Sequence, residues 1–547
     1  MLSALIWVPI FSAALVGFWP GTVTSKAARQ VALAVTMGVF IWSVVLLLQF
    51  NPTTVSQQFQ ENLRWIDALG LTYSLGVDGL SLPLLVLNGL LTGIALYSTD
   101  KTLDRPRLYY SLILLLNAGV AGAFLAQDLL LFFLFYELEL IPLYLLIAIW
   151  GGQRRGYAAT KFLLYTAVSG ALILVAFLGV VFLSGANSFA YVDTVALVSS
   201  LPQTQQLLLL GAILVGFGIK IPLVPFHTWL PDAHVQASTP ISILLAGVLL
   251  KLGTYGLLRF GLELFPDAWA VLAPGLAIWA VVSVLYGAFN AIAQRDMKKM
   301  VAYSSVAHMG YILLAAAAAT PLSLAASILQ MVSHGLISAL LFLLVGIVYK
   351  KTGSRDLDVL NGLLNPERGL PVIGSLMVVG VMASAGIPGM VGFISEFLVF
   401  RGSFPVFPVQ TLLCMLGTGL TAVYLLILLD RAFFGRLSMQ VINLPKVQWE
   451  ERMPGIVLAI LIVILGIQPG WLIRLSEMTT AAMVTTPPTV ALQSSDRATL
   501  EPAMKGVQNT EVQEFRINLP IKGWGFKKEP IVISDFAHYT GNNFYQL

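Results

Sequence analysis

The stretch from Asp128 to Trp150, DLLLFFLFYELELIPLYLLIAIW, decides the fold class of this chain. A helix needs about 20 mostly apolar residues to cross a bilayer, and this stretch is long enough to do so. A transmembrane β-strand would be shorter and would alternate between apolar and polar residues. The run from Ser111 to Leu125 is equally continuous. Such runs predict transmembrane helices and exclude a membrane β-barrel.

The whole chain has the same character. Of its 547 residues, 57% are hydrophobic and 11% are charged, and its mean hydropathy is +0.84. A soluble domain carries about a quarter charged residues and could not bury this much apolar surface. We therefore predict an all-α polytopic membrane protein with about 14 transmembrane helices. The apolar runs lie near residues 2–20, 30–50, 79–98, 108–126, 128–150, 158–184, 206–230, 240–261, 268–290, 300–319, 321–349, 370–400, 408–434 and 453–473.

The composition also excludes several kinds of site. The only cysteine, Cys414, lies in an apolar run, so this chain cannot form a disulfide framework, a cysteine-ligated iron–sulfur cluster or a four-cysteine zinc site. We expect neither a cofactor nor a metal on it. The net charge is only +4, and the basic residues are scattered over short loops, which argues against nucleic-acid binding. The first run lacks the basic start and cleavage site of a signal peptide, so we expect it to remain as the first span.

Loop charge predicts the orientation in the membrane. On one side acidic residues are in excess, and on the other Lys and Arg are in excess, among them Lys26, Arg105, Arg154, Lys298, Lys351 and Arg436. The positive-inside rule places the basic side in the cytoplasm and both chain termini on the opposite side.

Two predicted spans are interrupted in their middles. The seventh contains GIKIPLVP at 218–225, and the twelfth contains AGIPG at 385–389. Proline removes a backbone donor and kinks or unwinds a helix. Five spans separate the breaks, so matching segments would lie in opposite orientations, as in inverted repeats whose broken helices line an ion path. Simple packing kinks are the alternative.

These features predict a division of the chain into five parts. They are three N-terminal spans (1–107), a first and a second inverted five-helix repeat (108–261 and 262–435), a last span (436–475) and a polar tail (476–547). The end of the tail, Phe515–Leu547, is rich in aromatic residues. We expect it to dock on a neighbouring subunit.

Ionisable side chains inside the predicted spans are candidates for function. A charge at bilayer depth costs roughly 2.5 to 3.5 kcal/mol on insertion scales, so it needs a partner or a hydrated cavity. Two histidines also lie within spans, and His227 and His234 follow the first break. The candidates within spans are Glu137, Glu139, Lys220, Lys251, His308, His334 and Glu396.

Glu137 and Glu139 are two residues apart, which is about 200° around a helix, so their carboxylates face opposite ways. A carboxylate that faces Lys220 would form a proton-transfer pair, or a static ion pair that fixes helix packing. His308 and His334 have neighbouring hydroxyl and amide side chains, which favour a hydrated proton path. Haem ligation and a packing role are the alternatives for these histidines.

Several motifs together resemble those of a known family. They are GVDGLS at 76–81, YELELIP at 136–142, KIP at 220–222, HTWLPDAH at 227–234, LLK at 249–251, AYSSVAHMG at 302–310 and GIPG at 386–389, followed by Glu396 and Phe397. Over nearly its whole length the chain resembles the antiporter-like membrane subunits of respiratory complex I, and among these subunit 4. The 136–142 motif, with WGG at 150–152 and ATKF at 159–162, resembles the cyanobacterial and plastid branch.

The resemblance implies a proton-translocating subunit of a type I NAD(P)H- or ferredoxin-plastoquinone oxidoreductase, and thus a translocase subunit. Iron–sulfur clusters and quinone would be held by partner subunits, which include neighbouring antiporter-like subunits. The implied location is a cyanobacterial thylakoid membrane, in contact with lipid, with the cell inner membrane as the alternative. The start, MLSALIW at 1–7, is similar to that of a paralogue linked to CO2 uptake. A stand-alone cation/proton antiporter and a non-transporting membrane scaffold are the competing functions.

The resemblance also implies roles for single residues. Glu137 would pair with Lys220, the lysine of the broken helix, and Glu396 would be the terminal acid. A lysine at position 396 would instead have indicated subunit 5 or an antiporter subunit. The implied proton path consists of Glu137, Lys220, Lys251, His308, His334 and Glu396.

Overall fold

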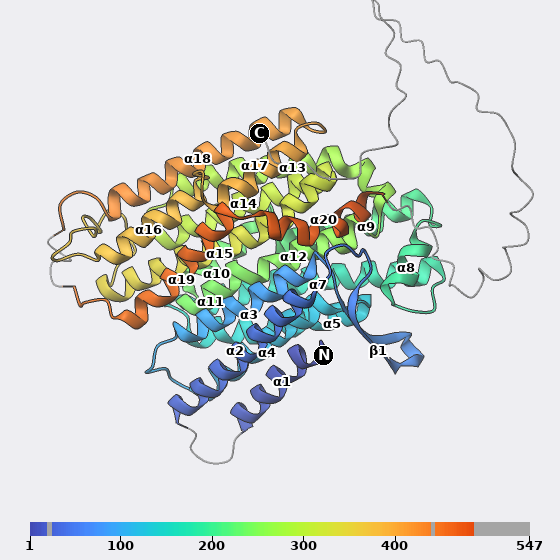
Figure 1. The fold of residues 1–547 in the computed structure, drawn as a ribbon, viewed down its shortest axis with the longest axis horizontal. Coiled ribbons are helices and arrows are strands. Elements are labelled where there is room, and N and C mark those ends of the chain that lie inside the picture. The colour runs from blue at the N-terminus through green and yellow to red at the C-terminus, as the bar shows by residue number, and fades with distance from the viewer. Residues whose placement is uncertain (19–23, 439–443, 486–547) are drawn as a thin grey trace, which may run out of the picture. The chain divides into compact units, whose positions relative to one another are not determined.

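The fold is described from a computed structural model, which describes residues 1–18, 24–438 and 444–485. This part of the chain is a bundle of long helices that run roughly alongside one another (Figure 1). The predicted tail beyond residue 485, with Phe515–Leu547, lies outside the described residues.

The first half of the described chain contains α1 (Ser3–Phe18), α2 (Ser25–Gln49), β1 (Gln58–Ile66), the short 3-10 helix η1 (Asp67–Leu69), β2 (Leu71–Val77), α3 (Ser81–Tyr97), α4 (Pro106–Leu125), α5 (Leu129–Leu138), α6 (Leu140–Trp150), α7 (Arg155–Ser184), α8 (Tyr191–Val198), α9 (Gln203–Lys220), the 3-10 helix η2 (Phe226–Thr228), α10 (Trp229–Gln236), α11 (Thr239–Leu244), the π-helix η3 (Leu245–Leu249), α12 (Leu250–Gly256) and the π-helix η4 (Leu257–Leu262). The second half contains α13 (Pro266–Ile292), α14 (Met297–Ala318), α15 (Pro321–Thr352), α16 (Pro371–Ser384), α17 (Val391–Ser403), α18 (Pro408–Ala432), α19 (Trp449–Ile467) and α20 (Gly470–Thr485).

The helices have the character of membrane spans. Within the described ranges, nine helices are long and apolar enough to cross a membrane, or ten if the bent pair α19 and α20 is one span. The apolar helices α1, α3 and α16 are shorter. The predicted class of a helical multi-pass membrane protein is confirmed, but the predicted count of fourteen spans is not. The count is lower because an interrupted span consists of two helices, and each of them is too short to cross a bilayer alone.

Both predicted interruptions are present. α9 ends at Lys220, and two prolines follow before the chain becomes helical again in η2 and α10. α16 ends at Ser384, and α17 begins at Val391. In this second break Gly386 and Gly389 have positive φ angles of 72° and 90°, which glycine adopts without a steric penalty.

A β-hairpin was missed by the prediction of an all-α chain. β1 and β2 pair antiparallel between α2 and α3. In β2 the side chains of Leu71, Tyr73 and Leu75 are buried and alternate with less buried neighbours, which is the period of two that a strand requires. Gly70 closes the turn in the left-handed region, with φ at 64°. The hairpin lies outside the apolar runs, so hydropathy alone could not reveal it.

The last helix also differs from the prediction. α19 ends at Ile467, and after Pro469 the chain turns by 68° into α20. This helix continues past residue 476, where the polar tail was expected to begin. One side of this helix is packed against the rest of the chain, because Leu472, Ser476 and Met483 are buried. The hydroxyl of Thr479 accepts a hydrogen bond from the Gly79 backbone N–H, at 3.1 Å.

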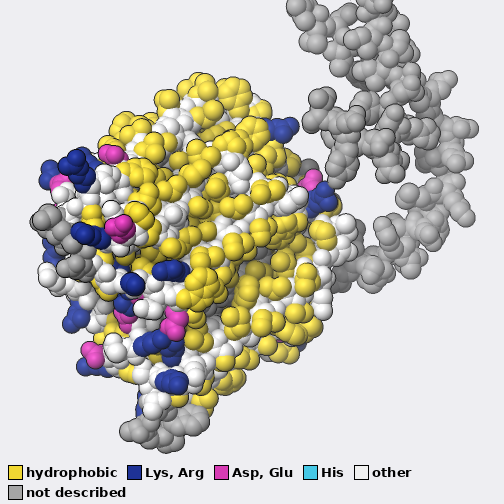
Figure 2. All heavy atoms as spheres, turned by 60° about the vertical axis from the view of Figure 1, so that its left-hand side comes forward, with side chains coloured by type: hydrophobic (Ala, Val, Ile, Leu, Met, Phe, Trp, Pro, Cys, Tyr) yellow, Lys and Arg dark blue, Asp and Glu magenta, His cyan; other side chains and the backbone are white. Residues whose placement is uncertain are grey.

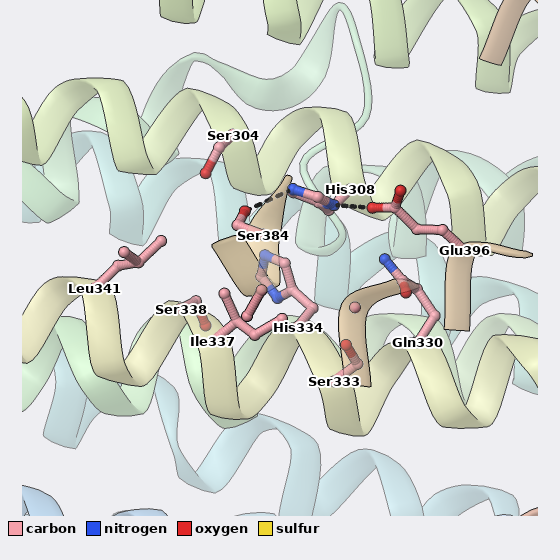
Figure 3. Close-up of a pocket in the computed structure, with 12 residues that line it drawn as sticks. Ser304, His308, Gln330, Ser333, His334, Ile337, Ser338, Leu341, Ser384 and Glu396 are labelled. Atoms are coloured by element: carbon pink, nitrogen blue, oxygen red, sulfur yellow. Dashed lines mark hydrogen bonds and ion pairs between the residues drawn. The ribbon is translucent and has the colours of Figure 1, made fainter. Parts of the chain in front are cut away.

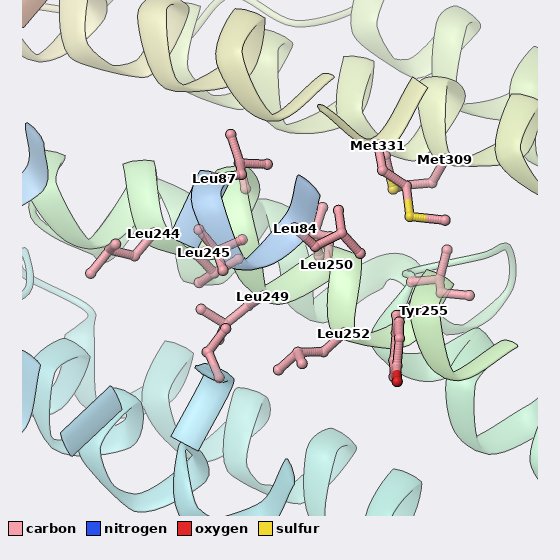
Figure 4. Packing of buried hydrophobic residues seen from close by; sticks show 14 of the residues in the cluster. Leu84, Leu87, Leu244, Leu245, Leu249, Leu250, Leu252, Tyr255, Met309 and Met331 are labelled. Atoms are coloured by element: carbon pink, nitrogen blue, oxygen red, sulfur yellow. The ribbon is translucent and has the colours of Figure 1, made fainter. Parts of the chain in front are cut away.

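The centre of the bundle is formed by three spans that have little contact with the outside. Every residue from Pro240 to Leu262 is buried, and so are nearly all residues of α14 and of the middle of α15. Leucines of α3 and of Thr239–Leu262 pack together, with Met309 and Met331 nearby (Figure 4). By contrast, most residues of α18 are exposed or only partly buried. Side chains on the three central spans are therefore shielded from lipid.

Basic side chains gather at one end of the bundle, the end on the left in Figure 1 (Figure 2). Ion pairs connect separate segments there, such as Lys101 with Glu450 at 2.6 Å and Lys350 with Asp100 at 2.5 Å. The grouping of basic loops agrees with the charge pattern of the sequence. That this end faces the cytoplasm remains a prediction from the positive-inside rule.

Candidate functional site

Lys220 occupies the first break. It is the last residue of α9, and Pro222 prevents the helix from continuing in regular form. Its side chain is only 2% exposed and forms an ion pair with Glu139. The Nζ atom also lies 4.8 Å from the centre of the Tyr136 ring. A buried ammonium group thus has a carboxylate partner and an aromatic face, as a charge at this depth requires.

The pairing differs from the one implied by the resemblance, which assigned Glu137 to Lys220. The structure places Glu139 on Lys220, while Glu137 is partly exposed and lies against α7. A Cβ atom added at Gly170 of α7 would lie 1.9 Å from Glu137 Oε1. Glu137 is still near enough to Lys220 for their charges to interact. The two carboxylates face different neighbours, as their spacing predicted.

The reason for this pairing lies at the junction of α5 and α6. α5 ends at Leu138, and Glu139 occupies the turn before α6. Pro142 has no N–H to donate to the carbonyl of Leu138, four residues earlier, so the helix is interrupted here. Glu139 itself keeps a right-handed helical backbone, with φ −76° and ψ −20°, so the helical turn between Glu137 and Glu139 is enough to point Glu139 into the interior.

Lys251 lies at the centre of the bundle, between two π-helical segments, η3 and η4. Such segments are rare and occur mostly at functional sites. Lys251 is fully buried, and its Nζ atom donates a hydrogen bond to the Ala246 carbonyl at 2.6 Å. The same atom lies 2.7 Å from His334 Nδ1 on α15. Lys251 thus has a hydrogen-bond partner that can exchange a proton with it.

His334 leads on to a second pair of groups. The rings of His334 and His308 have their centres 5.7 Å apart. His308 Nδ1 lies 3.3 Å from Glu396 Oε1, and its Nε2 lies 3.2 Å from the Ser384 hydroxyl (Figure 3). Four spans or half-spans therefore contribute to one continuous group of polar side chains.

Glu396 ends this row at the second break. Thr418 on α18 donates a hydrogen bond to Glu396 Oε2 at 2.9 Å. Gly386 lies so close that a Cβ atom there would be 3.4 Å from Oε2. A small cavity of about 10 Å³ is lined by His308, His334 and Glu396, together with Gln330 and several serines (Figure 3). This volume is about that needed for one water molecule.

The structure thus brings Lys251, His334, His308 and Glu396 into one row and joins Lys220 to Glu139. No hydrogen bond or ion pair within the described ranges connects Lys220 directly to Lys251. The two segments do touch, because a Cβ atom added at Gly253 would lie 3.2 Å from Lys220 Cβ. The backbone of α12 therefore packs directly against the first break.

A buried charge cluster near the end of the same span was missed. Arg259 in η4 pairs with Asp78 and with Glu263, the latter at 2.7 Å. The rings of Tyr191 and Tyr255 lie 5.5 and 5.7 Å from its guanidinium carbon. Burial would raise the pKa of Asp78, but the Arg259 charge and hydrogen bonds hold it below its ordinary value. Asp78 lies in the motif at 76–81, and Arg259 lies near the end of the predicted span at 240–261.

The geometry can be compared with known proteins. A family model described as NADH:quinone oxidoreductase/Mrp antiporter, TM, matches residues 126–421. The chain belongs to this family. The matched region of this antiporter-family chain contains every candidate from Glu137 to Glu396, and both breaks.

Curated relatives make the assignment more specific and agree with the resemblance to subunit 4. NAD(P)H-quinone oxidoreductase chain 4 3 of Trichormus variabilis is 43% identical over 448 residues, which cover 80% of this chain and 82% of the relative. NAD(P)H-quinone oxidoreductase chain 4 of Prochlorococcus marinus is 41% identical and covers 85% of this chain and 88% of its own length.

Solved structures show the same fold. A chain of respiratory complex I from Thermus thermophilus is 26% identical, with a TM-score of 0.79, and the match covers 88% of this chain and 99% of that chain. A chain of the Mrp complex from Dietzia sp. also has a TM-score of 0.79, at 20% identity, with 89% and 98% covered. The antiporter-family fold therefore occurs in both kinds of membrane complex.

Proposed function

We propose that this chain is a proton-translocating membrane subunit of an NAD(P)H-quinone oxidoreductase complex. The observation that carries the proposal is the row of buried titratable groups Lys251, His334, His308 and Glu396, with the Glu139–Lys220 pair at the first break. Each of these groups can bind and release a proton, and each is shielded from lipid. The name of the chain 4 relatives supports the same assignment.

The proton path begins at the first break. An ammonium group in the membrane interior is stable only while a carboxylate or water compensates its charge. Separation of Glu139 from Lys220 would leave Lys220 uncompensated, so it would give up its proton. Glu137, which lies near enough to act on Lys220, is the second carboxylate of this site. The driving force is quinone reduction in a partner subunit.

The second part of the path passes through hydrogen-bonding groups. Lys251 delivers the proton to His334 Nδ1, at 2.7 Å. A water molecule in the cavity beside both histidines would bridge the gap to His308. His308 then passes the proton to Glu396, at 3.3 Å. Thr418 holds Glu396 in place with its hydroxyl group.

The remaining parts of the complex follow from this role. Iron–sulfur clusters and quinone would be bound by partner subunits, and neighbouring antiporter-like subunits would flank this chain in the bilayer. The thylakoid membrane of a cyanobacterium is the proposed location, and the cell inner membrane is the alternative. The start of the chain, MLSALIW at 1–7, supports the further proposal that this chain is the paralogue linked to CO2 uptake.

The test uses membrane vesicles that contain the complete complex. Lys251→Met keeps most of the side-chain volume but cannot carry a proton, so proton uptake should fall at least about 100-fold. The amount of assembled complex, measured by native gel electrophoresis, should not change. Lys26→Met at the start of α2 is a matched control outside the path and should translocate normally. Normal translocation by Lys251→Met would contradict the proposal, as would proton/cation exchange by the isolated chain without redox subunits.

A further inference from the structure

The helix α3 packs against the centre of the row of titratable groups without contributing to it. From Ser81 to Tyr97 it contains no lysine, histidine or carboxylate. It contacts α11, η3 and α15, which are the elements around Lys251, and its leucines lie beside those of the central span (Figure 4). An effect of α3 on the row must therefore act through packing.

Two glycines lie where α3, η3 and α15 meet. Gly247 in η3 and Gly335 in α15 are both buried. A Cβ atom added at Gly335 would lie 3.0 Å from the carbonyl oxygen of Gly247, so the two backbones touch with no side chain between them. Small residues allow membrane helices to approach each other this closely.

Two leucines of α3 fill the space beside these glycines. Leu87 and Leu91 are one turn apart and buried. A Cβ atom at Gly335 would lie 2.7 Å from Leu87 Cδ2, and one at Gly247 would overlap Leu91 Cδ1. Carbon atoms pack best at about 3.5 to 4.0 Å. Each contact therefore has room for the hydrogen atom of a glycine and for nothing larger.

Each glycine directly follows a residue that contacts Lys251. Gly247 follows Ala246, whose carbonyl accepts the hydrogen bond from Lys251 Nζ at 2.6 Å. Gly335 follows His334, whose Nδ1 atom lies 2.7 Å from the same Nζ atom. The contact between the two backbones therefore determines how far the proton donor lies from its acceptor.

Hydrogen bonds hold α3 against α4 on another of its faces. The Asn88 side chain donates to the Asn117 carbonyl at 3.2 Å, and the Asn117 side chain donates to the Thr92 hydroxyl at 3.1 Å. All three side chains are 1% exposed. Asn88 and Thr92 follow the two leucines in sequence, so they are turned by about 100° around the helix. Polar contacts of this kind fix the packing of buried helices, and α4 thus supports α3.

A second anchor fixes the beginning of α3. Asp78 accepts hydrogen bonds from the N–H groups of Leu80 and Ser81, at 3.0 and 2.9 Å. It also forms the ion pair with Arg259 in η4. Since η3 and η4 flank α12 in the chain, α3 is attached to the central span on both sides of Lys251.

We propose that α3 positions Lys251 and His334 for proton transfer. Its two leucines hold η3 and α15 in backbone contact at the two glycines, and this contact sets the distance across which the proton moves. The Lys251 ammonium group gives its proton to the neutral His334 imidazole and becomes a neutral amine. The leucines and glycines carry no proton, so they are positioning residues. The inference rests on the proposed function and adds the element that sets its central distance.

The first experiment inserts a methyl group at each contact, and proton uptake is measured in vesicles of the complete complex. A misplacement of about 1 Å costs about 100-fold in rate, so a shift of about half that size in Gly335→Ala should cost roughly tenfold. Gly247→Ala meets only the end of the Leu91 side chain and should cost about threefold. Rates are compared per assembled complex, quantified by native gel electrophoresis. Uptake at the natural rate in both variants would overturn the proposal.

Shortening the opposing leucine should restore the rate. The double variant of Gly247→Ala and Leu91→Val conserves the total volume and should recover most of the natural rate. The double variant of Gly335→Ala and Leu87→Val should recover only in part, because the Gly247 carbonyl still opposes the new methyl group. Absence of recovery in the first double variant would overturn the proposed contact. If Gly335→Ala does not assemble, Gly247→Ala and its double variant decide the question.

A matched control makes the same change away from the row. A Cβ atom at Gly179 of α7 would lie 2.5 Å from Leu209 Cδ2 on α9, which repeats the overlap of a methyl group with the end of a leucine. Leu209 is about 16 Å along α9 from Lys220. Gly179→Ala should therefore pump at the natural rate. Equal losses in Gly179→Ala and Gly247→Ala would indicate a general loosening of the bundle and would overturn the proposal.

The ratio of uptake rates in H2O and D2O separates positioning from a loss of packing. Deuterium is transferred more slowly than a proton, so the ratio rises when proton transfer becomes the slowest step. It should be higher in Gly335→Ala than in the natural chain and should return towards the natural value when Leu87→Val is added. A slow Gly335→Ala variant with an unchanged ratio would contradict a role in positioning.

Parallel measurements on Lys251→Met keep the two proposals distinguishable. Normal pumping by Lys251→Met would refute the proposed function itself. A block in Lys251→Met together with natural rates in Gly247→Ala and Gly335→Ala would refute only the positioning role of α3.

Discussion

The two broken helices have similar sequences but build different sites. At the first break, Lys220 forms a buried ion pair with Glu139 under the ring of Tyr136. At the second break, Glu396 contacts the imidazole of His308 and the hydroxyl of Thr418, beside a cavity of about one water. Opposite charges at the first break must separate before a proton can leave. At the second break, hydrogen bonds already connect the groups that exchange it.

The comparison indicates that the two halves contribute to proton transfer in different ways. An ion pair in a low-dielectric region is costly to separate, so the first break can act as a barrier that needs an input of energy. A network of imidazole, hydroxyl and carboxyl groups transfers protons with little rearrangement. The following predictions test this difference, from the largest expected effect to the smallest.

The largest effect is expected for Lys220→Ala. It removes the titrating group of the first break but leaves Pro222 and the interruption intact, so the chain should still insert and assemble. Proton uptake by vesicles of the complex should fall at least about 100-fold. Lys161→Ala, which removes a partly exposed lysine paired with Asp232, should keep most of the activity. Equal rates in the two variants would contradict the proposal that the first break is a barrier to proton transfer.

The two glutamates near the first break provide a matched pair. Glu139→Gln should be severe, with a loss of about tenfold or more, because it leaves the Lys220 charge without its contact partner. Glu137→Gln should be milder, at most about fivefold, since a partner at longer range contributes about 1 kcal/mol or less. The same uptake assay measures both. The reverse order would favour the pairing implied by the family resemblance over the one in the structure.

Glu396 tests the second break. Glu396→Gln should block the last step of proton transfer and leave the Lys220 end able to titrate. Glu396→Asp should keep partial activity, about tenfold below the natural chain, because its carboxylate is displaced. Thr418→Val should cost about fivefold or less, the equivalent of one neutral hydrogen bond. Proton uptake during a single turnover distinguishes an early from a late block. Full pumping by Glu396→Gln would leave this carboxylate only a packing role.

The smallest effect on pumping is expected at a buried ion pair that lies outside the path. Asp78→Asn leaves Arg259 without one of its carboxylates, so thermal stability should fall, by up to about 3 to 5 kcal/mol, while protons per turnover stay the same. The pKa of Asp78 is below its ordinary value in the folded protein. Its stabilising contribution is therefore present above the unfolded pKa of about 3.9 and is lost as the pH falls towards the folded pKa.

Thermal unfolding of the detergent-solubilised complex, followed between pH 3 and pH 7, measures this contribution. The natural chain should lose stability more steeply than Asp78→Asn as the pH falls. A change in protons per turnover in Asp78→Asn would mean that this ion pair takes part in transport, which would remove the distinction between a static pair and the working pair at Lys220.

The packing of the helices decides which candidate residues meet, and the periodicity of the sequence does not predict these contacts. Lys251, His308 and His334 lie on three different spans, and only the packing of Thr239–Leu262, α14 and α15 brings them together. The inverted repeat and the division of the chain at residues 107, 261 and 435 remain predictions. So does the assignment of the basic end to the cytoplasm.

Local composition was sufficient to predict the membrane class and the two breaks, and it singled out the candidate residues, whose roles remain predictions. Apolar runs, prolines and isolated charges each have a physical consequence that does not depend on the rest of the chain. The tertiary structure was needed for everything that depends on where a side chain points. It assigned Glu139 to Lys220, because only the packing of this helix against α9 decides which of its two carboxylates faces Lys220. It also revealed the β-hairpin, α20 and the Asp78–Arg259 pair, since contacts between distant segments leave no mark on local hydropathy.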